Sequence, residues 1–280
     1  MKKNFFGLIL FLTVNALCFA ANVQTVGVPS ASMSKDVQTL IVSPNSGSGP
    51  ASVIYLLHGF GGDQNTWADI SPELGFWADH FNLIFVCPDG KNFWWMDSPI
   101  DETIRYETFV VDELVQYVDS KFNTLKDNSK RAISGCDTGG NSALYIAMKH
   151  PDVFKNAGSS SGVLDIFNVK WIPLDISRKK DLGLSLILGS KIKYKASWVE
   201  HSMLSQVKAI KTADIRIIID CGIDDEVSFR HTDDFHKQLA TKKIPHTFVA
   251  GSGIHDKQYW RSSISYQILF FVNHFNNVSE

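Results

Sequence analysis

A short apolar run that leads directly into a glycine-rich turn is the feature of this sequence that most constrains its fold. Arg131 to Cys136 has the length of a buried strand, and Asp137-Thr138-Gly139-Gly140 follows it at once. Ser142 to His150 then has the pattern of a helix, which ends before Pro151. A strand, a tight turn and a helix in this order indicate an α/β fold in which the turn lies at the carboxyl end of a strand.

The rest of the chain repeats this alternation of short apolar runs and helical spacing. Val23 to Val28 and Val37 to Val42 are expected to form opening antiparallel strands, and Val53 to Leu57 a buried central strand. We expect further strands at Leu83 to Cys87, Ile215 to Cys221 and Thr247 to Ala250, and helices at Tyr106 to Lys121 and Tyr259 to Phe275. The order predicts a mostly parallel central sheet with helices on both faces.

The first twenty residues have the layout of a secretory signal peptide. A basic start at Lys2-Lys3 precedes the apolar run Phe5 to Val14, and small residues end the segment at Ala20-Ala21. Lipidation at Cys18 is the alternative, although Leu17 and Phe19 beside it are bulky. We therefore expect residues 1–20 to be a signal peptide, residues 21–280 to form one domain, and the protein to be secreted or periplasmic.

Charge and cysteine content narrow the classes of partner. With 27 basic and 29 acidic side chains the formal net charge is −2, so no electrostatic signal favours nucleic acid or an anionic membrane. Cys87, Cys136 and Cys221 each fall in or at the end of an apolar run and are expected to be buried thiols. His231 and His236 are five residues apart on an expected helix and do not share a face, so no metal site is predicted.

Glycines around Asp137 fit a nucleophile elbow, a strained turn that lifts one side chain above a sheet. Gly135 and Gly139 flank that position, and His58-Gly59-Phe60-Gly61-Gly62 follows an earlier strand as a loop able to offer a backbone N–H to an oxyanion. An acid, Asp224 or Asp225, and His255 follow later strands. The order of nucleophile, acid and histidine is that of the α/β-hydrolases.

On these motifs, with Trp95 to Pro99, Tyr106 to Phe109 and Tyr259-Trp260, the chain resembles an esterase family of α/β-hydrolases. This family includes esterase D, the antigen 85 mycolyltransferases and feruloyl and acetyl esterases. The resemblance runs from Val23 to Phe275 and implies a carboxylic ester hydrolase that needs no cofactor. It implies a small-molecule or carbohydrate-linked ester as substrate.

The resemblance also assigns roles to individual residues. It implies that His255 is the general base and that Asp225 is the acid which orients it, with Asp224 as the alternative. The backbone N–H groups of Phe60 and Thr138 are expected to form the oxyanion hole. His58 is expected to shape its loop rather than to transfer protons.

The departure from the family lies at the elbow, which has Asp137 where the family has serine. A carboxylate with an ordinary pKa of about 4 is ionised at neutral pH, and its acyl product would be an unstable anhydride. Three interpretations remain open. The protein could hydrolyse esters through a variant Asp137/Asp225/His255 triad in which His255 activates water. It could instead be a pseudoenzyme that binds an acylated or glycosidic ligand, or a hydrolase whose Asp137 is a nucleophile that attacks saturated carbon. Asp137 could also be an altered residue in an ordinary serine esterase.

Aromatic residues after the turn Asp89-Gly90 are candidates for substrate binding. Trp94 and Trp95 could stack on a sugar or phenolic ring, with a place in the core as the alternative. The segment Val163 to Ser202 departs most from the regular alternation and is expected to form a cap or specificity insert.

Overall fold

The computed structural model describes residues 21–45, 49–168 and 183–276. Eight strands form one sheet in the order β1-β2-β4-β3-β5-β6-β7-β8. The strands are β1 (Asn22–Ser30), β2 (Lys35–Ser43), β3 (Ser52–Leu57), β4 (Leu83–Pro88), β5 (Arg131–Cys136), β6 (Asn156–Ser160), β7 (Arg216–Gly222) and β8 (Thr247–Gly251). Strand β2 pairs antiparallel with β1 and β4, and the remaining pairs are parallel. The predicted α/β fold with a mostly parallel sheet is confirmed.

Helices cover both faces of this sheet. The longer ones are α2 (Leu74–Phe81), α4 (Val115–Lys121), α5 (Thr138–Lys149), α8 (Val207–Ala213), α9 (Phe229–Thr241) and α10 (Lys257–Asn276). The shorter ones are α1 (Thr66–Ile70), α3 (Tyr106–Thr108), α6 (Leu184–Leu188) and α7 (Lys195–Glu200), with 3₁₀ turns at Asn128–Lys130 and Met203–Ser205. The helix predicted at Tyr106 to Lys121 is continuous through α3 and α4, with a π-helical stretch at Phe109–Leu114 between them.

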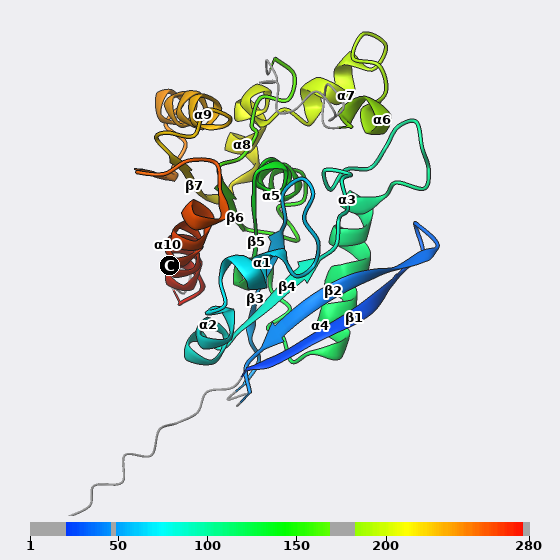
Figure 1. Cartoon of the computed structure of the whole chain (residues 1–280), viewed down its shortest axis with the longest axis vertical. Coiled ribbons are helices and arrows are strands. Elements are labelled where there is room, and N and C mark those ends of the chain that lie inside the picture. Colours follow the sequence, from blue (N-terminus) through cyan, green and yellow to red (C-terminus); the bar gives the residue numbers. More distant parts are fainter. Residues whose placement is uncertain (1–20, 46–48, 169–182, 277–280) are drawn as a thin grey trace, which may run out of the picture.

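Two apolar clusters pack these helices onto the sheet. One cluster joins the sheet to α3 to α5, α8 and α9, and the other joins it to α1, α2 and α10. Figure 1 shows α2 and α10 on one side of the sheet, α4 on the other, and α6 to α9 gathered at one end of the molecule. The three predicted free thiols, Cys87, Cys136 and Cys221, are all buried.

Strand β6 was not predicted, because its sequence Asn-Ala-Gly-Ser-Ser lacks an apolar run. The strand lies between β5 and β7 and all five of its residues are buried. A Cβ added to Gly158 would come within 2.2 Å of the Gln267 side chain on α10, so small residues are required where α10 packs closely. The Asn156 amide donates to the carbonyls of Ser129 and Arg131 and so joins β6 to the start of β5.

Two sequence predictions fall wholly or partly outside the described residues. The predicted signal peptide, residues 1–20, lies outside the described residues, and so do residues 169–182 of the predicted cap. The described part of that cap contains α6 and α7 and is joined to α5 by Asn141, whose amide donates to the carbonyl of His201. Within the described ranges, no helix is long and apolar enough to cross a membrane.

Candidate active site

Asp137 occupies a strained turn between β5 and α5, as the elbow prediction requires. Its backbone has φ 52° and ψ −120°, a left-handed conformation that a side-chain-bearing residue seldom adopts. A Cβ on Gly135 would lie 2.4 Å from the backbone of Gly139, and one on Gly139 would lie 2.4 Å from the carbonyl oxygen of Leu57. Both glycines are therefore needed for the turn to pack against β3.

The structure brings Asp137, His255 and Asp225 together from three loops at the carboxyl ends of strands. His255 Nδ1 lies 2.9 Å from Asp225 Oδ2, and His255 Nε2 lies 3.4 Å from Asp137 Oδ1. The Asp225 side chain is fully buried, whereas that of His255 is 20 % exposed and can be reached by a substrate. Asp224 is exposed on the same loop, whereas Asp225 contacts His255 directly, so the geometry favours Asp225 over Asp224 as its partner.

The Asp225 carboxylate is held from several sides. Its Oδ1 accepts hydrogen bonds from the N–H groups of Val227 and Ser228, at 2.9 and 2.8 Å. The Cys221 thiol lies 3.5 Å from Oδ2. Burial would raise the pKa of Asp225, but the hydrogen bond and charge of His255 and the backbone donor at Ser228 lower it. Asp225 is therefore a fixed, ionised partner of the imidazole at neutral pH.

The predicted oxyanion loop reaches the elbow, but the Asp137 carboxylate already occupies one of its donors. The Phe60 N–H donates to Asp137 Oδ2 over 2.8 Å. The other expected donor, the Thr138 N–H, belongs to the first residue of α5 and so has no acceptor within its own helix. Asp137 Oδ2 thus occupies a donor that was expected to bind an oxyanion, and Oδ1 is the oxygen that faces His255.

His255 is a cation in this resting site. Burial alone would lower its pKa, but the hydrogen bonds and negative charges of Asp137 and Asp225 raise it to about 10. The raised pKa favours the imidazolium form of His255 at neutral pH, and this form donates a proton rather than accepting one. The proton can only be donated from this state.

His58 holds the oxyanion loop in place, as expected. Its Nε2 accepts a hydrogen bond from the N–H of Gly90 at 2.9 Å, which leaves the ring proton on Nδ1, 2.8 Å from the carbonyl oxygen of Gly59. The ring is 1 % exposed. His58 is therefore buried behind the loop, between Gly59 and Gly90.

Trp94 and Trp95 correct the expectation of an aromatic binding platform. Both side chains are only 1 % exposed and belong to the apolar core. The Trp95 indole N–H donates to the carbonyl of His58, and its ring packs so closely on Gly90 that a Cβ there would lie 2.6 Å away. Stacking on a substrate ring is therefore not available to either tryptophan in this structure. Trp260 is the aromatic residue beside His255, with ring centroids 5.2 Å apart in an edge-to-face contact.

Ser228 is a site residue that sequence reasoning missed. It is fully buried, and its Oγ lies 3.4 Å from His255 Nδ1 while its N–H donates to Asp225. Its position could have indicated this role, because an aspartate often accepts a hydrogen bond from a residue two or three positions later in a turn. Its contacts make it a positioning residue for the pair.

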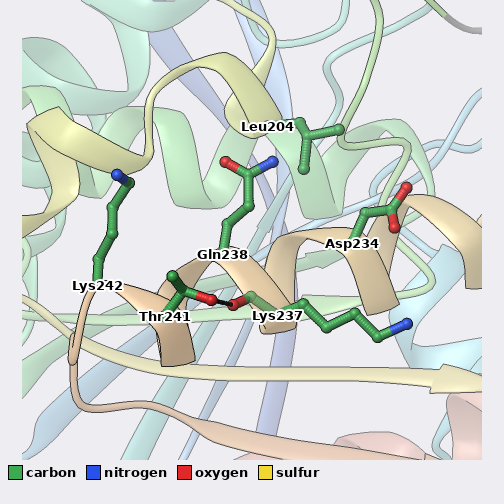
Figure 2. Close-up of a pocket in the computed structure, with 6 residues that line it drawn as sticks. All are labelled: Leu204, Asp234, Lys237, Gln238, Thr241 and Lys242. Carbon is green, nitrogen blue, oxygen red and sulfur yellow. Dashed lines mark hydrogen bonds between the residues drawn. The ribbon is translucent and has the colours of Figure 1, made fainter.

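No metal or cofactor site was predicted, and in the described ranges no group of three or more His, Cys, Asp or Glu residues could hold a metal ion. A surface hollow of about 310 Å³ lies along α9, and Figure 2 shows its six lining residues. They are Leu204, Asp234, Lys237, Gln238, Thr241 and Lys242. None of them belongs to the constellation around Asp137.

Comparison with known proteins agrees with this architecture. The family model described as "Putative esterase" matches residues 30–271. The chain is 30% identical over 223 residues to the diacylglycerol acyltransferase/mycolyltransferase Ag85B of Mycobacterium intracellulare, covering 71% of this chain and 62% of that protein. It is 25% identical over 211 residues to Esterase Rv1288 of Mycobacterium tuberculosis, covering 69% of this chain and 46% of that protein.

A solved structure shows the same fold. A ferulic acid esterase superposes with a TM-score of 0.75 at 24% identity, covering 92% of this chain and 99% of the other. The chain spans 62% and 46% of the length of the two curated relatives, so their whole activities do not transfer to it directly. The family match over most of the chain and the shared fold nevertheless establish that this protein belongs to the esterase family of the α/β-hydrolase fold.

Proposed function

We propose that this protein is an exported hydrolase of carboxylic esters that works through Asp137, His255 and Asp225. The observation that carries the proposal is the position of the His255 ring between two carboxylates, 2.9 Å from Asp225 and 3.4 Å from Asp137, at the esterase elbow. Export is supported by the secretory layout of the first twenty residues. The names of the relatives support an ester as the substrate class.

The charges favour Asp137 as the base and His255 as the acid, the reverse of the roles in a serine esterase. Because His255 is protonated, the Asp137 carboxylate is the group able to take a proton from water, through Oδ1. The resulting hydroxide attacks the ester carbonyl, and the imidazolium gives its proton to the departing alkoxide. The proton on Asp137 then passes to His255, which restores the starting state.

Turnover by this route is expected to be slow. The substrate carbonyl oxygen must displace Asp137 Oδ2 from the Phe60 N–H before that donor can stabilise an oxyanion, and no acyl-enzyme divides the reaction into two easier steps. When a triad lacks a member, the oxyanion hole and substrate binding alone still contribute roughly 10³- to 10⁴-fold over water.

Hydrolysis of p-nitrophenyl acetate by matched variants tests the proposal. His255→Gln and Asp225→Asn should each reduce kcat/KM by about 10² or more, the usual range for lost acid–base catalysis. Asp224→Asn is the control, since it makes the same chemical change on the exposed neighbour of Asp225. Activity equal in all four proteins would contradict catalysis at this site and favour the pseudoenzyme that binds an acylated or glycosidic ligand.

A second candidate, attack by Asp137 on saturated carbon, is favoured by one contact. The Phe60 N–H fixes Oδ2, while Oδ1 faces His255 over 3.4 Å. The same N–H would stabilise the oxyanion formed when water later hydrolyses an alkyl ester of Asp137. Alkylation would also remove the charge that keeps His255 protonated, so that the ring could then activate water.

Mass spectrometry separates the two candidates. His255→Gln protein incubated with an epoxide and an alkyl halide should carry a covalent adduct on Asp137 only if this residue is a nucleophile. With the same epoxide or alkyl halide in H₂¹⁸O, a nucleophilic Asp137 in the unmodified protein takes up label in its carboxylate, because water attacks the carbonyl of its alkyl ester, whereas a general base does not. Absence of both adduct and label would exclude the second candidate.

A further inference from the structure

Two histidines that are distant from Asp137 face each other between α9 and β8. His236 Nδ1 lies 2.8 Å from His246 Nε2, and the ring centroids are 5.0 Å apart. His236 is on α9, and His246 immediately precedes β8. Both side chains are partly exposed, so solutes can reach them.

Hydrogen bonding fixes which nitrogen of His246 has the available lone pair. Its Nδ1 lies 2.8 Å from the carbonyl oxygen of Ile244, which can only accept, so the ring proton is on Nδ1 and the lone pair is on Nε2. A backbone carbonyl that holds the second ring nitrogen in this way is the usual arrangement around metal-binding histidines. His246 Nε2 therefore points toward His236 as an oriented ligand.

His236 is also held in position. Its ring stacks on Phe248 of β8, with centroids 4.3 Å apart and an interplanar angle of 21°. This contact keeps its Nδ1 facing His246 Nε2 over 2.8 Å. The Asp233 carboxylate, one turn earlier on α9, is paired with Lys237, so the two rings are the groups that define the site.

We propose that His236 and His246 form a binding site for a zinc ion or a similar transition-metal ion, with water completing the coordination. On binding, the His236 proton moves from Nδ1 to Nε2, and the two facing nitrogens replace two waters of the ion. Zinc bonds of about 2.0–2.1 Å in a tetrahedral site place the two nitrogens about 3.3 Å apart. The two facing nitrogens are 2.8 Å apart without a metal ion, so binding requires them to separate by about half an ångström.

The site would link α9 and β8, which adjoin the loops that hold Asp225 and His255. The loop that holds Asp225 and Ser228 leads directly into α9, and β8 ends four residues before His255. Metal binding by the folded protein would therefore stabilise the fold at the edge of the sheet, since a ligand that prefers the native state raises the melting temperature.

Calorimetric titration of the chelator-treated, untagged full chain with ZnCl₂ tests this proposal. We expect about one zinc ion per chain, a rise in Tm of about 3 °C or more at 1 mM zinc, and no response to MgCl₂, because imidazole suits zinc rather than magnesium. His236→Gln and His246→Gln should each weaken binding about tenfold or more and remove the rise in Tm, measured against each variant's own metal-free Tm.

The control is His80→Gln on α2, an exposed histidine that stacks on Phe76 much as His236 stacks on Phe248. This variant and His255→Gln should bind zinc as the unmodified protein does. Zinc affinity retained within threefold in either His236→Gln or His246→Gln would overturn the proposal. Loss of binding in His255→Gln would overturn it too, because the ion would then belong to the Asp137 site.

Discussion

Replacing Asp137 with asparagine should release His255 from its protonated state. The substitution keeps the shape of the side chain and removes the negative charge that lies 3.4 Å from His255 Nε2. The charge of Asp225, 2.9 Å from Nδ1, remains. The pKa of His255 should therefore fall from about 10 toward the value that one carboxylate can maintain.

The separation of the two groups sets the size of this fall. Two unit charges 3.4 Å apart attract each other by about 1 kcal/mol in water and about 5 kcal/mol at an effective dielectric constant of 20. At 1.36 kcal/mol per tenfold change in the proton equilibrium, the pKa should fall by about 1 to 3.5. The Asp137 side chain is only 12 % exposed, which favours the upper half of this range.

Histidine ring resonances followed by NMR between pH 5 and 11 measure the effect. The His255 signal is assigned among the nine histidines by its loss in His255→Gln. Asp224→Asn serves as the control and should leave the titration unchanged. If His255 titrates near 6.5 both in the unmodified protein and in Asp137→Asn, the argument that Asp137 keeps the imidazole charged is refuted.

Three further predictions concern stability and pH. Because the pKa of His255 is raised in the folded protein, its protonation stabilises the fold by at most about 5 kcal/mol; this contribution is complete below pH 6.5 and is lost as pH rises to about 10. Urea unfolding at pH 6.5 and pH 10 should show the loss, and a free energy of unfolding that does not fall would contradict it. Gly139→Ala should destabilise the fold by about 3 kcal/mol or more because its Cβ meets backbone at 2.4 Å, whereas Gly251→Ala, with nothing within 4 Å, should change it by less than about 1 kcal/mol in the same assay. If the His255 imidazolium is the acid, ester hydrolysis should decline as pH rises through about 10, and a rise through pH 7 to a plateau beyond pH 10 would show instead that His255 acts as a base.

Much of this fold could be predicted because its strands are apolar runs closed by turn residues. Strands β3, β4 and β7 and the elbow at β5 are of this kind. Strand β6 could not be predicted, since its small polar residues are buried by the close approach of α10, which depends on Gln267 far along the chain. The pattern of apolar residues in a sequence predicts strands that bury apolar side chains well, but it does not predict strands that are buried through close backbone packing.

The sequence suggested which residues surround the elbow and that Asp137 carries a negative charge, but not how its carboxylate is held. Chain order was enough to suggest Asp137, Asp225 and His255, whereas the contact between Asp137 Oδ2 and the Phe60 N–H depends on the exact approach of two loops. The buried positions of the two tryptophans likewise follow from packing on Gly90. The pairing of His236 with His246 depends on how β8 returns beside α9, which spacing alone does not define.

The most direct test of the central claim is the esterase activity of Asp137→Ser. If the fold, the oxyanion donors and the His255–Asp225 pair form an intact esterase site, a serine at the elbow leaves Phe60 N–H free and removes the charge that keeps His255 protonated. Hydrolysis of p-nitrophenyl acetate should then rise by about 10² or more over the unmodified protein, and the gain should disappear in Asp137→Ser/His255→Gln. A folded Asp137→Ser protein that is no more active than the unmodified one would contradict the claim that this site is built to hydrolyse esters.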